Sequence, residues 1–189
     1  MNVPRSNYWP LSSAIPAAVL RRAGVVRTVI FDVDGVLTDG GLYFGPNGEE
    51  YKRFNTQDGH GLKLLRRADI DIALITARRA PALDARVQEL GITHFYPGSE
   101  NKLRAFEKIC TDLACDARDC CYVGDDLVDL PVIIRCGLAI AVANASHITK
   151  ATAHWTTSQP GGSGAVREVC ELILHAHGRL DAAIEEYLQ

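Results

Sequence analysis

The sequence lacks several features that mark other classes of protein. No apolar stretch approaches the roughly 20 residues needed to cross a bilayer, so we expect no membrane-spanning segment. Lysine and arginine number 20 against 23 acidic residues, and no basic stripe with interleaved aromatics occurs, so we expect no nucleic-acid partner. Pro10 and Pro16 interrupt the N-terminal apolar segment and Arg21 and Arg22 come after it, which does not match a signal peptide. We therefore expect a cytoplasmic protein.

The cysteines also lack a familiar pattern. No two of them have CxxC spacing, and no histidine lies at a ligand spacing from them; they are Cys110, Cys115, Cys120, Cys121, Cys136 and Cys170. This pattern favours reduced intracellular thiols over a disulfide framework or a zinc site.

What is present is an alternation of strand and helix patterns in 189 residues. Apolar, β-branched runs predict strands at 26–32, 70–76, 93–98, 120–125 and 138–143, with a weaker one at 153–157. Helical patterns predict helices at 59–69, 80–90, 101–113, 126–137 and 164–178. This order predicts an α/β fold with a doubly wound parallel sheet covered on both faces.

The same pattern suggests how the chain is divided. We expect one domain at 25–178, an extension at 1–24 and a helical tail at 179–189. The turn signal GPNG, flanked by aromatic residues, predicts a projecting β-hairpin at 41–54. Its exposed Tyr43, Phe44 and Tyr51 are typical of an interface.

Polar side chains stand where the predicted strands end. In a parallel sheet these ends share one edge, where ligands bind. The residues concerned are Asp32, Asp34, Thr76, Arg78, Lys102, Asp125 and Asp129. We therefore expect them to converge in one crevice.

Clustered carboxylates need a cation, because their mutual repulsion raises their pKa values. Mg²⁺ prefers oxygen ligands together with substrate phosphate, and Asp32, Asp125 and Asp129 suit that role. One carboxylate can form an aspartyl-phosphate, and a second, two residues along, can act as general acid and base. Thr76 and Lys102 can bind the transferring phosphoryl oxygens.

The segment DVDGVLTDG, followed by Thr76, Lys102 and GDDLVD, resembles the four-motif signature of haloacid dehalogenase superfamily phosphatases. The resemblance implies a Rossmann-like core, with Asp32 as nucleophile and Asp34 as general acid/base. It also implies that Asp32, the backbone carbonyl of Asp34 and Asp125 hold Mg²⁺. Asp129 would support the ion directly or through water. A helix N-terminus and a catalytic role both remain open for Asp126.

A closer resemblance covers residues 25–178. The segments FNTQDGHGLKLL, LITARRAP, LGITHFYPGSENKL, VGDDLVDLPV and GGSGAVREVCELIL are similar to the family of 3-deoxy-D-manno-octulosonate 8-phosphate phosphatases. That resemblance implies a small phosphorylated sugar acid as substrate and a role in lipopolysaccharide precursor biosynthesis. It further implies a capless fold and a homotetramer with active sites between subunits.

The resemblance also indicates where substrate would bind. The expected contacts are Arg78, Asn55, Asp58, Gly59, His60, Gly161 and Gly162. A packing role is the alternative for His60. Gln57 and Ser163 stand where the family usually has arginine, which weakens the assignment of one sugar. Arg78 points back to the eight-carbon acid, because relatives acting on nine-carbon keto sugars typically have glutamate there.

Other functions remain as alternatives. A phosphatase of a nine-carbon keto-sugar phosphate is the nearest. A receiver-like signalling module would also use acids, threonine and lysine on such a sheet, but it lacks the DxD acid/base. A catalytically silent oligomerisation module is a third. No GxGxxG follows the first strand, so a dinucleotide-binding domain is not expected.

Overall fold

The central sheet has six strands in the order β5-β4-β1-β6-β7-β8, and every neighbouring pair is parallel. It is seen in a computed structural model that describes residues 15–189. The strands are β1 (Thr28–Asp32), β4 (Asp71–Thr76), β5 (His94–Pro97), β6 (Cys120–Gly124), β7 (Leu138–Ala141) and β8 (Trp155–Thr156). The predicted doubly wound parallel sheet, including its weak sixth strand, is therefore confirmed.

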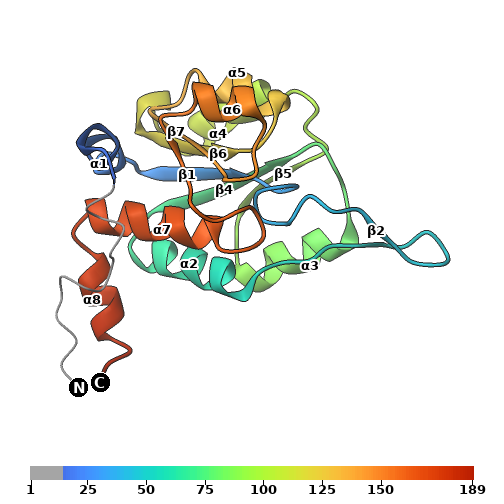
Figure 1. Cartoon of the computed structure of the whole chain (residues 1–189), viewed down its shortest axis with the longest axis horizontal. Coiled ribbons are helices and arrows are strands. Elements are labelled where there is room, and N and C mark those ends of the chain that lie inside the picture. The colour runs from blue at the N-terminus through green and yellow to red at the C-terminus, as the bar shows by residue number, and fades with distance from the viewer. Residues whose placement is uncertain (1–14) are drawn as a thin grey trace.

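Helices cover both faces of this sheet (Figure 1). One face carries α1 (Ala17–Ala23), α2 (Thr56–Arg67), α3 (Pro81–Leu90) and α7 (Ala165–Ala176), with α8 (Leu180–Glu185) next to α7. The other carries α4 (Lys102–Asp112), α5 (Leu130–Ile133) and α6 (His147–Thr152). Each face has its own apolar core, so every residue of β1 is buried, as expected for a central parallel strand.

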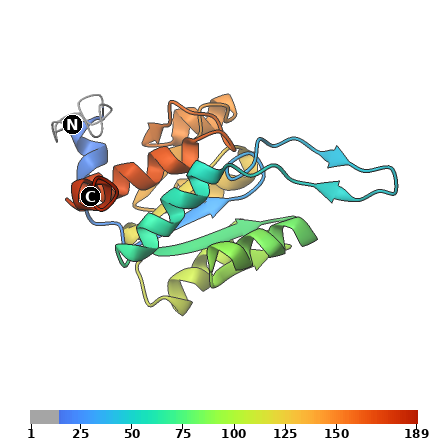
Figure 2. The same cartoon turned by 90° about the horizontal axis from the view of Figure 1, so that it is seen from below.

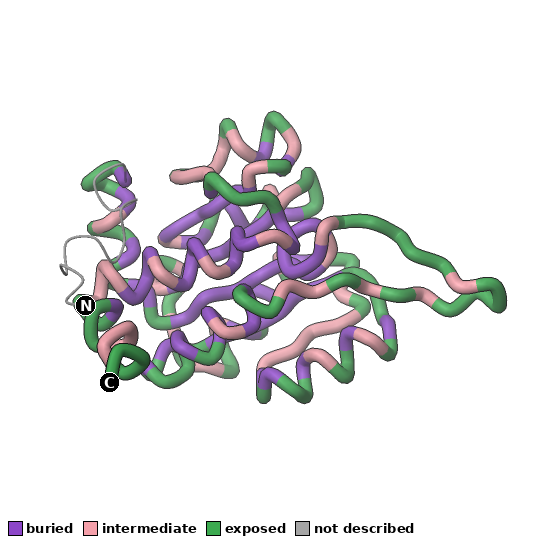
Figure 3. The backbone as a smooth tube through the Cα atoms, turned by 60° about the horizontal axis from the view of Figure 1, so that its bottom comes forward, coloured by how far each residue is buried: buried purple, intermediate pink, exposed green. Residues whose placement is uncertain are grey.

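The hairpin is the one insertion between β1 and α2. Its short strands β2 (Tyr43–Phe44) and β3 (Glu50–Tyr51) pair antiparallel and project from the body of the molecule (Figure 2). Most of its backbone is exposed, in contrast to the buried sheet (Figure 3). No further domain covers the sheet within residues 15–189, which agrees with the capless fold that we predicted.

The predicted helix at 126–137 is wrong in its extent. The chain instead forms a 3₁₀ turn at Leu127–Asp129 followed by the single turn of α5. Asp126 and Asp129 form a capping box that starts this segment, so Asp126 does occupy a helix N-terminus. Pro131 lacks a backbone N–H, which gives a physical reason why a regular α-helix does not run through this segment.

Helix α2 begins three residues earlier than predicted, at Thr56. The Asn55 side chain accepts hydrogen bonds from the backbone N–H groups of Gln57 (2.7 Å) and Asp58 (3.3 Å), so Asn55 is the N-cap. The periodicity of apolar residues did not reveal this turn because its first residues are polar. Helices α1 and α6 were not predicted at all.

The two ends of the described chain pack on the same core. Val19 and Ala23 of α1 and Leu180 of α8 are buried in the cluster that contains α7. Residues 1–14 of the expected extension lie outside the described residues, and our domain boundaries stay a prediction. Within residues 15–189, no helix is both long enough and apolar enough to cross a bilayer.

Candidate active site

Three neighbouring strands bring the predicted residues to one edge of the sheet. Asp32 ends β1, Thr76 ends β4 and Asp125 directly follows β6. Because β1 lies between β4 and β6, Asp32 is central, with the other two on either side. Lys102 reaches the same edge as the first residue of α4.

Lys102 links two of the carboxylates. Its Nζ lies 2.8 Å from Asp32 Oδ1 and 2.6 Å from Asp129 Oδ1, and only 4% of the residue is exposed. Burial by itself would lower the pKa of Lys102, but the charges of Asp32 and Asp129 outweigh burial and hold the pKa above its usual value. Lys102 is therefore a fixed positive charge beside Asp32.

Asp129 is fully buried, and each oxygen of its carboxylate accepts two hydrogen bonds. Oδ1 accepts hydrogen bonds from Lys102 Nζ and from the Tyr122 hydroxyl, both at 2.6 Å. Oδ2 accepts from the backbone N–H groups of Asp125 (2.9 Å) and Asp126 (3.1 Å). These bonds fix the loop that follows β6 and thereby position the Asp125 side chain. Tyr122, which completes this network, was not among the predicted site residues.

The carboxylates of Asp32, Asp125 and Asp129 form one group, with an oxygen of each within 4.8 Å of the others. Burial is the main cause that raises the pKa values of Asp32 and Asp125, and the nearby charge of Asp129 adds to it. Such a group of hard oxygen donors fits a divalent cation like Mg²⁺, which would favour the ionised form of each acid. The donor chemistry thus matches the ion that the sequence predicted.

Asp34 lies beside this group and is held by two side chains. The Thr76 hydroxyl donates to Asp34 Oδ2 at 3.3 Å, and Lys52 Nζ forms an ion pair with Oδ1. The Lys52 side chain is only 1% exposed and also lies 2.9 Å from Glu50 Oε1. Sequence reasoning missed Lys52 because it belongs to the hairpin, and no spacing within the hairpin indicates that its returning arm crosses the site.

Arg78 also lies near the base of the hairpin. Its backbone N–H donates to Thr76 Oγ1 at 3.0 Å, so Arg78 directly flanks the site. Its partly exposed guanidinium lies 3.7 Å from Glu50 Oε2. The structure therefore places Arg78 close to Asp34 and Lys52, while its predicted contact with a substrate carboxylate stays a prediction.

The glycine loop at 161–164 packs against the backbone of the first motif, DVDGVLTDG. Gly162 N–H donates to the Val36 carbonyl at 2.9 Å, and Gly161 N–H donates to Asn144 Oδ1 at 2.8 Å. A Cβ on Gly161 would lie 1.7 Å from the Gly35 carbonyl oxygen, so only glycine fits there. This contact alone accounts for Gly161, and the substrate contacts predicted for Gly161 and Gly162 remain to be tested.

The predicted substrate contacts at the start of α2 all have partners inside the chain. The buried Asp58 carboxylate accepts from the backbone N–H groups of Gly164 (3.3 Å) and Arg167 (2.8 Å), which satisfies the N-terminus of α7. The His60 ring packs edge-on against Tyr187 with centroids 5.4 Å apart. Gly59 leaves room for Arg86, whose Nη2 would lie 2.2 Å from an added Cβ. These contacts are structural, and any role toward substrate stays a prediction.

Two pockets open near these residues. One, of about 420 Å³, includes Lys102 and Val128. The other, of about 370 Å³, lies along α7 and is lined by Gln57, Ser163 and Arg167, among others. The two positions at which the sequence departs from the family pattern therefore face the same cavity, beside an arginine of this chain.

Comparisons with known proteins agree with this geometry. A model of haloacid dehalogenase-like hydrolases matches residues 91–168. The curated 3-deoxy-D-manno-octulosonate 8-phosphate phosphatase of Yersinia pestis is 48% identical over 165 residues, which cover 87% of this chain and 88% of the relative.

Solved structures give the same result. The Moraxella catarrhalis 3-deoxy-D-manno-octulosonate 8-phosphate phosphatase, in complex with magnesium, phosphate and the sugar acid, has a TM-score of 0.88 and 40% identity, covering 89% of this chain and 97% of that one. The cobalt-bound Haemophilus influenzae phosphatase has a TM-score of 0.85 and 38% identity, covering 89% and 99%. With identity this high over nearly the whole length, the chain belongs to the 3-deoxy-D-manno-octulosonate 8-phosphate phosphatase family of haloacid dehalogenase-like hydrolases.

Proposed function

We propose that the chain is a phosphatase that hydrolyses 3-deoxy-D-manno-octulosonate 8-phosphate to the free sugar acid and phosphate in lipopolysaccharide precursor biosynthesis. One observation carries the chemistry: Asp32 lies 2.8 Å from the buried Lys102 ammonium, in a carboxylate group with Asp125. The family membership supports the substrate. We further propose that the reaction takes place in the cytoplasm.

In the first half of the reaction, a carboxylate oxygen of Asp32 attacks phosphorus in line with the sugar oxygen. The bond from phosphorus to that oxygen breaks while the bond to Asp32 forms. Asp34 gives its proton to the leaving oxygen, which releases the sugar acid and leaves an aspartyl-phosphate on Asp32. Lys102 and Thr76 stabilise the charge that develops on the phosphoryl oxygens.

In the second half, Asp34 takes a proton from a water molecule as that water attacks phosphorus. The bond between phosphorus and Asp32 breaks, so inorganic phosphate leaves and the Asp32 carboxylate is restored. Asp34 is then protonated again and ready for the next substrate. Lys52 holds one oxygen of Asp34, which keeps this acid in place for both halves, whereas the single hydroxyl proton of Thr76 shifts its hydrogen bond from Asp34 to a phosphoryl oxygen when substrate binds.

We propose that Mg²⁺ is held by the carboxylates of Asp32 and Asp125 and by the backbone carbonyl of Asp34. When bound, the ion neutralises these acids and the phosphoryl oxygens. Asp129 serves the ion indirectly, because both of its oxygens already accept hydrogen bonds. A cobalt-bound relative indicates that other divalent ions suit such a site.

We propose that Arg78 binds the substrate carboxylate. Its side chain is partly exposed beside the site and has only a long contact to Glu50 at 3.7 Å, so it is free to form a closer, bidentate pair. Arg167, which lines the pocket shared by Gln57 and Ser163, is the nearest replacement for the arginines missing there.

We also propose a homotetramer with active sites between subunits. The hairpin exposes apolar side chains that water disfavours, with Leu42, Phe44 and Tyr51 each at least 50% exposed. A closed symmetric assembly would bury them. Light scattering should report four copies at micromolar concentration, and a fully active monomer would contradict the assembly.

The proposed function is tested by a panel of phosphorylated substrates assayed for phosphate release with Mg²⁺. We expect the highest kcat/KM for the eight-carbon sugar acid phosphate. A preference for a nine-carbon keto acid would move the assignment to that sugar. One phosphorylation per chain without turnover would favour the receiver-like alternative, and no reaction with any substrate would favour a silent module.

A further inference from the structure

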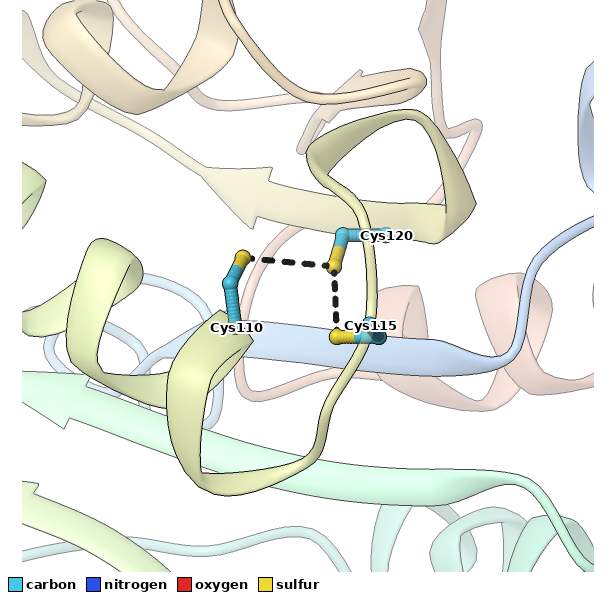
Figure 4. Close-up of side chains that lie close together, drawn as sticks. All are labelled: Cys110, Cys115 and Cys120. Carbon is cyan, nitrogen blue, oxygen red and sulfur yellow. Dashed lines mark hydrogen bonds between the residues drawn. The ribbon is translucent and has the colours of Figure 1, made fainter.

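Three cysteines that are separated in sequence converge in one cluster (Figure 4). The cluster lies at the amino end of β6, whereas the active-site residue Asp125 follows its carboxyl end. Cys110 belongs to the last turn of α4, Cys115 to the following loop, and Cys120 is the first residue of β6. The Cys120 sulfur lies 3.6 Å from the Cys115 sulfur and 4.0 Å from the Cys110 sulfur. All three sulfurs lie within 4.8 Å of one another.

The local backbone directs these sulfurs toward one point. Ala114 adopts a left-handed conformation (φ 47°), which an alanine enters only at a cost of about 1 kcal/mol or more. The turn returns the chain so that Cys115 N–H donates to the Cys110 carbonyl at 3.0 Å. The Thr28 hydroxyl approaches Cys115 Sγ at 3.8 Å, so the thiol is also oriented from β1.

The spacing of the sulfurs matches that of ligands around one ion. Thiolates bound at about 2.3 Å in a trigonal arrangement lie about 4 Å from one another, and soft sulfur ligands select ions such as Cu(I) and Zn²⁺. Structural zinc sites are normally closed by four protein ligands, whereas this group comprises three sulfurs alone among the described residues. A site with three sulfur ligands therefore favours Cu(I), which accepts three ligands, over Zn²⁺, which normally takes four.

We propose that Cys110, Cys115 and Cys120 form a three-thiolate site for a soft monovalent cation, Cu(I). On binding, each thiol releases its proton to solvent as its sulfur bonds to the ion, and no oxidation takes place. Cys110 and Cys115 are partly exposed, so the ion can enter from solvent, and the buried Cys120 closes the site from inside.

A disulfide is the competing use of these sulfurs, and the structure disfavours it. A disulfide would employ two of the three and leave the third without a role. The closest pair of sulfurs, those of Cys115 and Cys120, lies 3.6 Å apart, well beyond the S–S bond length of about 2.05 Å, and both cysteines are free in the structure.

The site is tested on the full chain, fully reduced and without oxygen, by titration with Cu(I) supplied as its complex with the chromophoric chelator bicinchoninate. We expect the protein to remove one Cu(I) per chain from the chelator. X-ray absorption of the copper should show about three sulfur neighbours at about 2.3 Å. Cys110→Ser and Cys115→Ser should each lower the affinity at least about tenfold, because a hydroxyl is a poor ligand for a soft ion.

Cys136→Ser is the matched control. Cys136 lies outside the cluster, and its sulfur contacts the carbonyls of Ile133 and Leu138, which a serine hydroxyl can also reach. We expect it to bind Cu(I) as the unaltered chain does, and all three variants to keep their phosphatase activity as a sign of intact folding. Equal Cu(I) binding by Cys115→Ser and the unaltered chain would overturn the proposal. So would displacement of Cu(I) by equimolar Zn²⁺.

Discussion

The two ends of strands β1 and β6 carry opposite chemistry. At the carboxyl ends, Asp32 and Asp125 present hard, charged oxygens next to the Lys102 ammonium. At the amino ends, Thr28 and Cys120 are paired in register, and the Cys120 sulfur lies beside two other soft sulfurs. Three buried residues separate Thr28 from Asp32 and four separate Cys120 from Asp125, so one sheet can offer a site for Mg²⁺ at one end and for a thiophilic ion at the other. In this sheet, the two ends of the same strands thus present different classes of donor atom, oxygen at one end and sulfur at the other.

Asp32→Asn is expected to have the largest effect on phosphatase activity while leaving the cysteine cluster at the other end of the strands unchanged. An amide is a very poor nucleophile and carries no charge for the ion, so kcat should fall at least about 10³-fold. Phosphate release measures this loss, and circular dichroism checks that the variant folds. Cu(I) binding at the other end should be unchanged. Substantial turnover by folded Asp32→Asn would show that another residue is the nucleophile.

Chelation should sharpen the distinction between hard and soft ligands. EDTA should remove phosphatase activity and excess Mg²⁺ should restore it, because the carboxylate group needs a hard cation. Asp125→Ala should raise the Mg²⁺ concentration required for half-maximal activity. Full activity after exhaustive chelation would show that the site at the carboxyl ends of the strands does not depend on a metal ion.

Lys52→Met tests whether the hairpin belongs functionally to the carboxyl end. Removing the ammonium frees one oxygen of Asp34, so proton transfer should suffer and kcat should fall about 10²-fold. KM should change less than kcat, since Lys52 acts through Asp34. Arg53→Met is a control from the same arm, because its side chain is largely exposed and, within residues 15–189, contacts a carboxylate only at Asp39, at 3.5 Å. Equal effects of the two changes would mean that Lys52 only supports the hairpin.

Arg78→Ala should weaken kcat/KM for the octulosonate phosphate by about 10- to 100-fold, because a charged hydrogen-bonded pair is worth about 1.5–3 kcal/mol. Hydrolysis of p-nitrophenyl phosphate, which has no carboxylate, should change little. Equal losses on both substrates would assign Arg78 to the chemistry or the fold.

The smallest effect on phosphatase activity is expected from a change in the cysteine cluster at the amino end of β6. Cys115→Ser should leave phosphatase activity within about twofold, because partly exposed positions remote from a site tolerate polar substitution. The assay is phosphate release in copper-free buffer. A loss larger than tenfold would show that the two ends do not act independently.

The residues that gather at the carboxyl ends of the strands were easier to predict from the sequence than those at the amino ends, for a physical reason. Strand ends can be located from apolar runs, and parallel pairing then brings Asp32, Thr76 and Asp125 to one edge. The Asp34 partner Lys52 could not be found in this way, since the direction of a hairpin arm depends on tertiary contacts. The cysteine cluster was also missed, because its convergence requires the left-handed turn at Ala114 that no periodicity reveals.

The differences between predicted and observed helices can also be traced to particular residues. The helix expected at 126–137 is shortened to a 3₁₀ turn and a single turn of α-helix, because Pro131 has no backbone N–H to continue the hydrogen bonding from the 3₁₀ turn. Conversely, the helix predicted at 80–90 ends at Leu90 as expected, because the left-handed Gly91 that follows is a local stop signal. The roles of the individual site residues toward substrate and metal stay predictions, which the variants above address.

The support of the first motif by the last large helix has a consequence for biosynthesis. The loop that follows Asp32 is held by Gly162, and Asp58 is joined to Gly164 and Arg167 across more than 100 residues. During synthesis from the N-terminus, the nucleophile therefore emerges from the ribosome long before its supports. A nascent chain that stops before residue 161 carries all four motifs without these supports, so we expect phosphatase activity only after residues 161–167 have been made.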